Sequence, residues 1–465
     1  MINGHFMKYH IILITALISI FNSNLLQSQG IQPGTTHPQY WSYDGERILL
    51  LGGSKEDNLF QIEGLEEHLD LLESVGGNYV RNTMSSRDEG NLWPFTKNED
   101  GVYDLEKYNY EYWQRFEHFL RETSERDIIV QLEVWATFDF YREIWDLNPF
   151  NPKNNVNYEY RRTKLTETVD THPIYAENNF FRSVPRQMAN AQLLEFQQKF
   201  VDKLLSHSLK YDHVLYCIDN ETSVPSDWGE FWSGYIREKA ERMDKTVHVT
   251  EMWDPWDLSH AFHRSTFNHP ETYSFVEISQ NNHITGEEHW LNGLEQIERL
   301  KQIGALRPVN NVKIYGNDGG RHKTTRDAIE AFTRNVLFGS ASARFHRPAS
   351  GQGLNTIAQN VIESIRSVSD STDFFNMKPS NHLLGSREAN EAFLRAKQNE
   401  EYILYFPKTG SVNLRLNREQ YNYRMKWLNL LTSDWMETEA ISARELLEVE
   451  TPSDDHWIVW IYRLN

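Results

Sequence analysis

Short apolar or β-branched runs alternate with helix-period segments through most of this chain. Eight of these runs are typical of strands: Arg47–Gly53, Asn78–Met84, Ile128–Trp135, Val214–Glu221, Val247–Trp253, Ser274–Ser279, Val312–Gly316 and Ala343–Phe345. Helical patterns lie between them, as over Ile62–Ser74, with apolar residues at Ile62, Leu65, Leu69 and Leu72. Eight strand–helix units in succession predict a (β/α)8 barrel. A doubly wound parallel sheet is the alternative, but the sequence has neither a GxGxxG turn nor a P-loop to support it.

The pattern changes toward the C-terminus. From Ala389 onward the chain consists of short strand-like runs separated by turn residues such as Pro407–Gly410. This pattern predicts a small antiparallel β-sandwich domain. We therefore expect a barrel over residues 31–375 and a β-domain over residues 376–465.

Residues 1–30 have the pattern of a targeting segment. Lys8 is the one charged residue, the apolar run Ile11–Phe21 follows it, and a polar stretch leads to Ile31. This is typical of a signal peptide, which predicts export to the periplasm or the extracellular space. A membrane anchor is the alternative, but the run is too short to cross a bilayer, so no stable membrane insertion is expected.

The formal net charge of −19 limits the partners of the chain. Nucleic acid and anionic membrane surfaces both call for a basic footprint, so neither is expected. The single cysteine, Cys217, excludes a disulfide framework and a thiolate zinc site. The histidines form no HExxH motif, and no GxSxG elbow occurs, so we expect no metal, no cofactor and no serine nucleophile.

Active sites of such barrels form at the C-terminal ends of the strands. Carboxylates, amides and tryptophans dominate those positions here, and sugar sites are built from such groups. Two carboxylates on opposite walls can cleave a glycosidic bond. Glu221, after the fourth run, is the expected general acid/base, and Asp318, after the seventh, is the expected nucleophile or base. Glu277 and Glu251 are rivals for the second role.

Other strand-end residues are expected to bind or position the substrate. Arg81 would keep the nucleophile ionised, with Asn220 and Glu277 beside the catalytic pair. Trp135, Trp253 and Trp256 are candidate sugar platforms, although buried tryptophans are equally common. His346 is read as a substrate contact rather than a metal ligand.

Two regions of the chain carry a family resemblance. The first resembles the opening of the apiosidase-like glycoside hydrolases and consists of LLGGSKEDNLF (Leu50–Phe60) followed by GGNYVRNTMSS. The second resembles their C-terminal β-domain, once labelled collagen-binding, and contains EEYILYFPKTGSVNLRL and HWIVWIY. The resemblance implies a (β/α)8 enzyme of polysaccharide breakdown. In the wider retaining clan an Asn–Glu pair on strand 4 matches Asn220 and Glu221, and an Arg on strand 2 matches Arg81. The strand 7 nucleophile is normally Glu, whereas KIYGNDGG offers Asp318, and the frequent strand 8 Trp is replaced around Phe345–His346.

These observations together predict an exported glycoside hydrolase of plant- or algal-type polysaccharides or their oligosaccharides. A retaining mechanism is favoured, with an inverting one left open. A catalytically silent glycan-binding barrel is one alternative, which Asp318 permits. A polysaccharide lyase or esterase is another, which Arg321, His322 and Lys323 in the pocket would favour. The oligomeric state is left open.

Overall fold

The computed structural model describes residues 30–172, 178–319, 322–438 and 440–464. The predicted signal peptide falls on residues 1–30 and so lies almost wholly outside the described residues. Among the residues described, no helix combines the length and apolar character needed to span a membrane.

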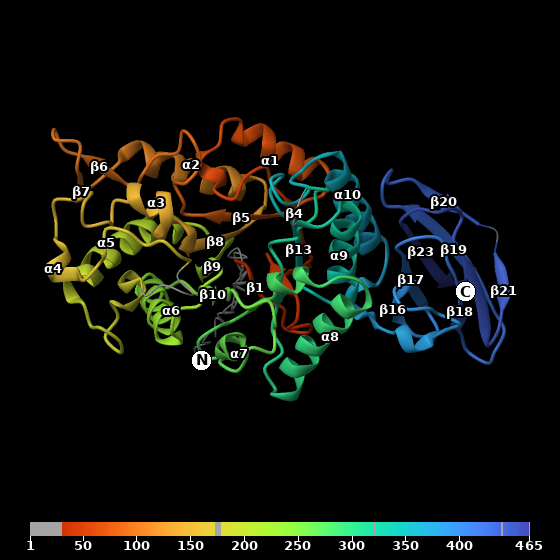
Figure 1. The fold of residues 1–465 in the computed structure, drawn as a ribbon. Helices are drawn as coiled ribbons and strands as arrows, with labels where there is room; N and C mark the ends of the chain where they lie inside the picture. Colours follow the sequence, from red (N-terminus) through yellow and green to blue (C-terminus); the bar gives the residue numbers. More distant parts are fainter. Residues whose placement is uncertain (1–29, 173–177, 320–321, 439, 465) are drawn as a thin grey trace, which may run out of the picture.

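Eight parallel strands build the centre of the larger part (Figure 1). Six form one sheet in the order β13–β4–β5–β8–β9–β10, and β11 pairs with β12. Their bounds are β4 (Leu50–Gly53), β5 (Tyr79–Thr83), β8 (Ile129–Trp135), β9 (Val214–Asp219), β10 (His248–Thr250), β11 (Val276–Glu277), β12 (Val309–Asn310) and β13 (Ser342–Phe345). Backbone hydrogen bonds continue across both gaps, from Ser274 to Val249 (3.0 Å) and from Ala341 to Val309 (2.7 Å). The sheet therefore closes, and the predicted (β/α)8 barrel is confirmed.

The seventh strand differs from its predicted position. The run Val312–Gly316 was expected to pair, but β12 ends at Asn310 and only Ile314 forms a further bridge, to Phe345. The physical reason is that side-chain hydroxyls replace strand carbonyls here: Ser342 accepts from the Asn311 amide (2.8 Å) and Ser279 from the Val312 amide (2.9 Å). The first strand is also shorter than expected, because residues 46–48 belong to a separate antiparallel strand.

The barrel helices bury one apolar stripe each against the strands. They are α1 (Leu65–Ser74), α2 (Tyr110–Glu125), α5 (Ala191–Ser208), α6 (Ser226–Glu241), α7 (Ala261–Phe267), α8 (Gly286–Gln302), α9 (Thr325–Phe338) and α10 (Thr356–Ser371). A capping box formed by Thr324 and Asp327 starts α9. Gly52 lets β4 approach β5 closely, since a Cβ there would lie 1.8 Å from the Tyr79 carbonyl oxygen.

Smaller elements decorate the barrel. The antiparallel strands β1 (Gln32–Pro33), β2 (Trp41–Tyr43) and β3 (Glu46–Ile48) precede it, and β6 (Phe95–Lys97) pairs with β7 (Tyr103–Tyr108). The long segment after β8 contains α3 (Arg142–Leu147) and α4 (Tyr160–Thr163). Trp41 on β2 donates to Asn310 on β12 (2.9 Å), so this first sheet closes one end of the barrel.

The C-terminal region is antiparallel and rich in strands, as predicted. The larger sheet has the order β14–β16–β17–β23–β19–β20, with β21 paired to β19, and the smaller has the order β15–β18–β22. The bounds are β14 (Lys378–Pro379), β15 (Leu384–Gly385), β16 (Phe393–Lys397), β17 (Glu401–Phe406), β18 (Ser411–Arg415), β19 (Tyr421–Asn429), β20 (Trp435–Glu437), β21 (Ile441–Ala443), β22 (Leu446–Glu450) and β23 (Trp457–Arg463).

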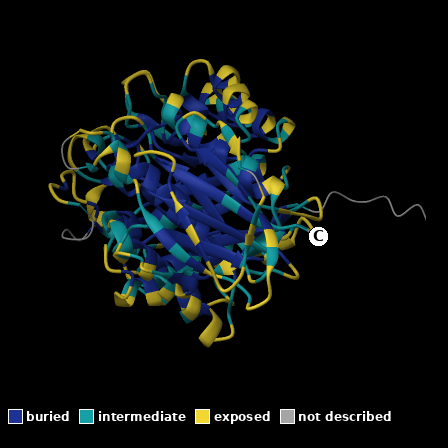
Figure 2. Ribbon diagram, turned by 90° about the vertical axis from the view of Figure 1, so that its right-hand side faces the viewer, coloured by how far each residue is buried: buried dark blue, intermediate teal, exposed yellow. Residues whose placement is uncertain are grey.

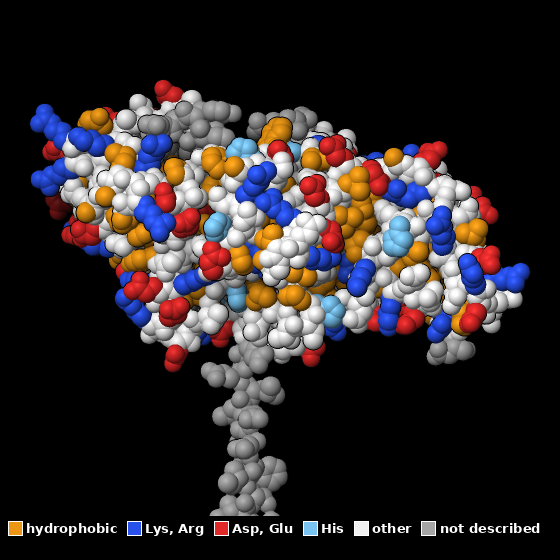
Figure 3. All heavy atoms as spheres, turned by 90° about the horizontal axis from the view of Figure 1, so that it is seen from below, with side chains coloured by type: hydrophobic (Ala, Val, Ile, Leu, Met, Phe, Trp, Pro, Cys, Tyr) orange, Lys and Arg blue, Asp and Glu red, His pale blue; other side chains and the backbone are white. Residues whose placement is uncertain are grey.

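The larger sheet is buried on both faces. One face contributes Phe393, Ile403, Tyr405 and Ile458 to the barrel's hydrophobic core, and the other packs on the smaller sheet through a second cluster. In Figure 1 the blue C-terminal strands lie beside α9 and α10. Figure 2 shows buried strands in the middle of the molecule and exposed residues at its periphery. On the face drawn in Figure 3, basic and acidic side chains are interspersed, so the acidic excess is not gathered there in one patch.

Candidate active site

Arg81 on β5 is the hub of a buried polar network at the C-terminal ends of the strands. Its guanidinium binds both oxygens of Glu133 on β8 (2.6 and 2.7 Å) and donates to the Asn220 side chain (2.7 Å). The Nη1 nitrogen of Arg81 pairs with Asp57 at 2.7 Å and lies 3.4 Å from Nε2 of His346. Arg81 is 1% exposed, so these charge-assisted bonds are shielded from water. The network fixes residues from strands 1, 2, 3, 4 and 8 relative to one another.

Asp57 is surrounded by cations. Besides Arg81, it pairs with Arg87 at 2.9 Å and Arg347 at 3.5 Å, and His346 lies 3.4 Å away. Burial alone would raise the pKa of Asp57, but Arg81, His346 and Arg87 hold it well below its usual range. Burial lowers the pKa of His346 to about 4 despite Asp57, so at neutral pH the imidazole is uncharged. The site thus contains a permanent carboxylate and a neutral histidine beside it.

Glu221 follows β9 directly and faces this network. Lys313 forms an ion pair with its carboxylate at 2.8 Å, and the Tyr315 hydroxyl donates to the same oxygen at 3.2 Å. Burial would raise the pKa of Glu221, but Lys313, Arg81 and His346 lower it to about 2. The carboxylate is therefore ionised at neutral pH, and its side chain keeps 25% exposure. A carboxylate that is charged yet accessible suits a nucleophile or a base better than a proton donor.

The backbone at Glu221 is strained, since its φ is 54°. A non-glycine residue in this left-handed region costs free energy, and such residues cluster at functional sites. Thr137, after β8, donates its hydroxyl to the Asn220 carbonyl and so helps to hold the turn. The strain aims Glu221 away from the sheet direction.

Asp254 is a second carboxyl group near Glu221. It follows β10, and its backbone N–H donates to the Thr222 carbonyl at 2.9 Å, which fixes it next to the turn that carries Glu221. Burial and the charge of Glu221 raise the pKa of Asp254 to about 6, although Lys313 lowers it. The two carboxyls thus have pKa values pushed apart by their surroundings, the pattern of an acid and a base that work together.

Asp318 lies elsewhere. It is exposed, and its carboxylate accepts from the backbone and the hydroxyl of Thr325 (2.9 and 2.5 Å) at the start of α9. The hydrogen bonds to Thr325 lower its pKa. The described side-chain hydrogen bonds of Asp318 are both to Thr325, and none of them links it to Glu221.

Glu277 lies deeper in the barrel. Its carboxyl accepts from Gln131 (3.3 Å) and from the Ser279 backbone (2.8 Å), and burial raises its pKa to about 7. Gln131 precedes Glu133 by two residues on β8, so Glu277 contacts this strand nearer its N-terminal end than Arg81 does. Glu251, the other candidate, is also buried and accepts from the backbone amides of Asp219 on β9 and of Met252, just after β10.

Two of the three predicted sugar platforms are covered by protein. Trp135 is 2% exposed and packs among aromatic rings that include Phe180 and Trp228. Trp253 is 1% exposed, and its indole N–H donates to Thr266 at 2.7 Å. The exposed indole of this loop is Trp256, at 63%.

Sequence reasoning missed Lys313 and Tyr315 as site residues. Both lie after β12 in the segment whose strand position was mispredicted, so nothing marked them as strand-end groups. Sequence reasoning also did not identify Asp254 as a partner of Glu221. Of the lyase residues, Arg321 lies outside the described residues, and His322 packs its ring 5.6 Å from Tyr315.

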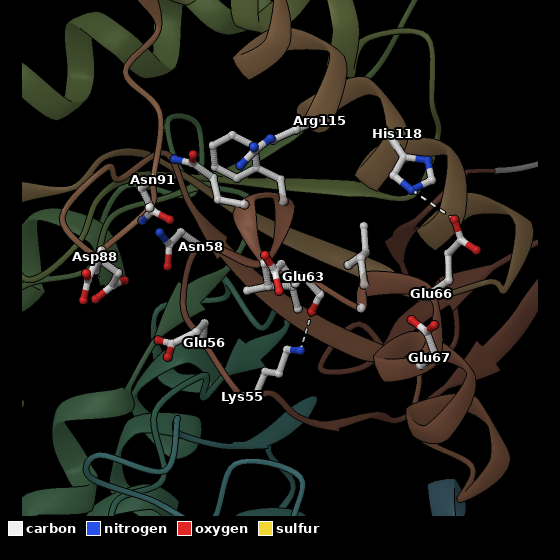
Figure 4. A pocket seen from close by; sticks show the side chains of 17 residues that line it. Lys55, Glu56, Asn58, Glu63, Glu66, Glu67, Asp88, Asn91, Arg115 and His118 are labelled. Atoms are coloured by element: carbon white, nitrogen blue, oxygen red, sulfur yellow. Dashed lines mark hydrogen bonds and ion pairs between the residues drawn. The ribbon is translucent and has the colours of Figure 1, made fainter.

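An acidic pocket of about 760 Å³ adjoins this network (Figure 4), because Glu56 and Asp88 in its lining both pair with Arg347. Its lining comes from residues 55–67 and 88–91 and from α2, and Figure 4 shows His118 paired with Glu66. Glu66, His118 and Glu122 could in principle share a metal ion. However, Arg126 and Arg121 already pair with Glu122 at 2.8 and 2.9 Å, so the group is better explained as an ion-pair network.

Comparison with known proteins finds similarity at the level of structure. No protein-family model matches the sequence, and no curated protein sequence does. A family 5 glycoside hydrolase from Bacteroides vulgatus superposes with a TM-score of 0.62 at 11% identity, covering 93% of each chain. A second glycoside hydrolase gives 0.61 at 10% identity over 93% of this chain and 96% of that one. The chain has the fold of these glycoside hydrolases.

A further solved structure matches part of this chain. A family 5 mannosidase from Rhizomucor miehei gives a TM-score of 0.51 at 11% identity, with 73% of this chain and 97% of that chain covered. At these identities the likeness establishes the fold, and the chemistry has to be argued from the side chains.

Proposed function

We propose that this protein is a glycoside hydrolase in which Glu221 acts as an ionised carboxylate and Asp254 supplies the proton. The observation that carries the proposal is the placement of the two carboxyls on adjacent strand-end turns of the barrel. Lys313 holds Glu221 at 2.8 Å, and the Asp254 N–H binds Thr222, next to Glu221, at 2.9 Å. These surroundings move the two pKa values in opposite directions.

The chemistry follows from these states. Asp254 gives its proton to the glycosidic oxygen as the bond to the anomeric carbon breaks, and the leaving group departs as an alcohol. In one route Glu221 forms a bond to that carbon, and water then hydrolyses the glycosyl ester while Asp254 takes the proton of that water. In the other route Glu221 takes a proton from the water that attacks the carbon directly. Arg81 and Lys313 keep Glu221 charged, and Tyr315 orients it. Product stereochemistry distinguishes the two routes.

This assignment changes the roles expected from sequence. Glu221 was expected to be the acid/base, but its ion pair with Lys313 opposes protonation. Asp318 was expected to be the nucleophile, but Thr325 engages both of its oxygens. Asp254 takes the second place because it is partly buried and shares an electrostatic environment with Glu221.

The protein is further proposed to act on a plant- or algal-type glycan and to be exported from the cell. The resemblance to apiosidase-like enzymes supports a plant- or algal-type polysaccharide or its oligosaccharides as the substrate. The apolar run near the N-terminus supports export.

The deciding experiment is a screen of the wild-type protein against a glycan panel with detection of the product anomer. Glu221→Gln and Asp254→Asn should each lower kcat/KM by about 10²–10⁴-fold. Asp318→Asn is the matched control and should stay within about threefold of wild type. If Asp318→Asn loses activity while Asp254→Asn keeps it, the catalytic pair is Glu221 and Asp318, as expected from the sequence.

A glycan-binding barrel without catalysis is the second candidate. The Lys313–Glu221 ion pair favours it. A carboxylate whose charge is balanced by a lysine can accept a hydrogen bond from a sugar hydroxyl without taking part in catalysis. Retention of the wild-type protein by a glycan that it does not cleave would support this function.

A further inference from the structure

Trp256 is an exposed aromatic residue on a firmly held loop. Its indole is 63% exposed, although a side chain of this size normally buries most of its surface. The loop itself is anchored at several points: Asp254 donates its backbone N–H to Thr222 (2.9 Å), and the Pro255 carbonyl bonds the buried His263 ring (2.7 Å). The exposed indole is therefore presented in a fixed position.

An aromatic ladder connects this indole to the candidate catalytic carboxylate. Trp256 stacks on His283, with ring centroids 4.0 Å apart and planes 13° from parallel. His283 lies 5.5 Å from the Tyr315 ring, and the Tyr315 hydroxyl bonds Glu221 at 3.2 Å. Two ring contacts and one hydrogen bond thus lead from Glu221 to the open face of Trp256.

The charge state of the ladder suits an uncharged ligand. Burial lowers the pKa of His283 to about 4, so its ring is neutral at neutral pH and stacks on the indole as an aromatic surface. His283 supports one face of Trp256. A flat apolar surface with polar groups around it binds the CH face of a pyranose ring while the hydroxyls stay hydrated.

We propose that Trp256, supported by His283, is a sugar-binding subsite for a second pyranose ring next to the one bound at Glu221 and Asp254. The proposal deepens the proposed function and rests on it for the position of the reacting sugar. Asp254 and Trp256 belong to one short loop, so this loop supplies both the proton donor and the platform.

Binding is tested without turnover in the Glu221→Gln background. Affinity electrophoresis through gels containing xylan, glucomannan, xyloglucan, rhamnogalacturonan, laminarin or carrageenan should show retardation by at least one glycan. Adding Trp256→Ala should weaken that binding by about tenfold, and Trp256→Phe should retain most of it. Tyr110→Ala, at an exposed aromatic residue on α2, is the matched control and should change nothing.

The proposal is overturned if no glycan retards the protein, or if Trp256→Ala leaves the retardation unchanged. Its failure is distinguishable from failure of the proposed function. Trp256-dependent binding without hydrolysis by the wild type would keep the subsite and reject the enzyme. Hydrolysis by the wild type, with binding that does not depend on Trp256, would keep the enzyme and reject the subsite.

In the catalytically active protein, the same subsite predicts that Trp256→Ala affects a long substrate and a short one differently. Trp256→Ala should raise KM for an oligosaccharide about tenfold while kcat/KM for an aryl monoglycoside of the same sugar stays within about twofold, because that substrate has no second ring. Equal effects on both substrates would contradict the subsite.

Discussion

Lys313 and Glu221 form an ion pair of 2.8 Å between the seventh and fourth strand ends of the barrel. Lys313 is 3% exposed and also donates to Asn220, so its charge is held inside the site. Among the groups that lower the pKa of Glu221, Lys313 contributes most, and an ionised Glu221 can act as a nucleophile or a base.

Removing that cation should move the acidic limb of the pH–activity profile. In Lys313→Met the carboxylate keeps its burial but loses its strongest neighbour, so the pKa of Glu221 should rise from about 2 by at least about one unit. Because the proposed mechanism needs Glu221 ionised, activity at pH 3 relative to pH 6 should fall by about twofold compared with wild type. Lys55→Met, at an exposed lysine, is the control. A pH profile identical to wild type would show that Glu221 ionisation does not limit the rate.

Replacing the proposed proton donor should make the rate depend on the leaving group. Asp254→Asn cannot donate a proton, so kcat/KM for a natural glycan should fall by about 10²–10⁴-fold, whereas a dinitrophenyl glycoside, which departs without protonation, should lose less than about tenfold. The decline of wild-type activity above about pH 6 should disappear in this variant. Asp257→Asn, at an exposed acid of the same loop, should behave as wild type. Equal losses on both substrates would exclude Asp254 as the acid.

The hub of the network should be essential for stability. Arg81→Met leaves Asp57 and Glu133 buried without their main partner, which should lower the free energy of unfolding by about 3–5 kcal/mol. Arg87→Met removes only a partly exposed contact of Asp57 and should cost about 1 kcal/mol or less. Urea unfolding of the two variants measures the difference. Equal stability would mean that water replaces the guanidinium in the barrel.

The convergence of Arg81, Asn220 and Glu221 could be anticipated from sequence, because parallel strands of a barrel bring their C-terminal ends together. The fold could be predicted for the same reason, since the strand and helix periods are local properties. The site's charge balance could not be predicted. Lys313 was hidden because hydroxyls of Ser279 and Ser342 replace the expected ladder, which moved the seventh strand.

The electrostatic roles depended on neighbours distant in sequence. Whether Glu221 is charged depends on Lys313, and whether Asp254 holds its proton depends on burial and on Glu221. Side-chain exposure was likewise out of reach: the sequence presents Trp253 and Trp256 as equivalent, and only the packing on Thr266 and Phe262 buries the first.

A second pair of acids should make the protein less stable at higher pH. Glu251 accepts from the backbone N–H of Asp219 at 2.9 Å, and both side chains are fully buried. Burial raises the pKa values of both Asp219 and Glu251 well above their usual range, and the charge of Asp219 raises that of Glu251 further. In the unfolded chain these groups ionise above about pH 4 while the folded protein keeps them protonated, so stability falls as pH rises beyond that value.

Glu251→Gln should relieve this loss. The introduced amide still accepts from the Asp219 backbone and never ionises, so Tm at pH 8 should exceed that of wild type by about 2 °C or more, with little difference at pH 4. Glu241→Gln, at an exposed residue of α6, is the control and should follow wild type throughout. Calorimetry across pH 4–8 measures both variants. Parallel Tm curves for Glu251→Gln and wild type would mean that Glu251 is already ionised in the folded protein.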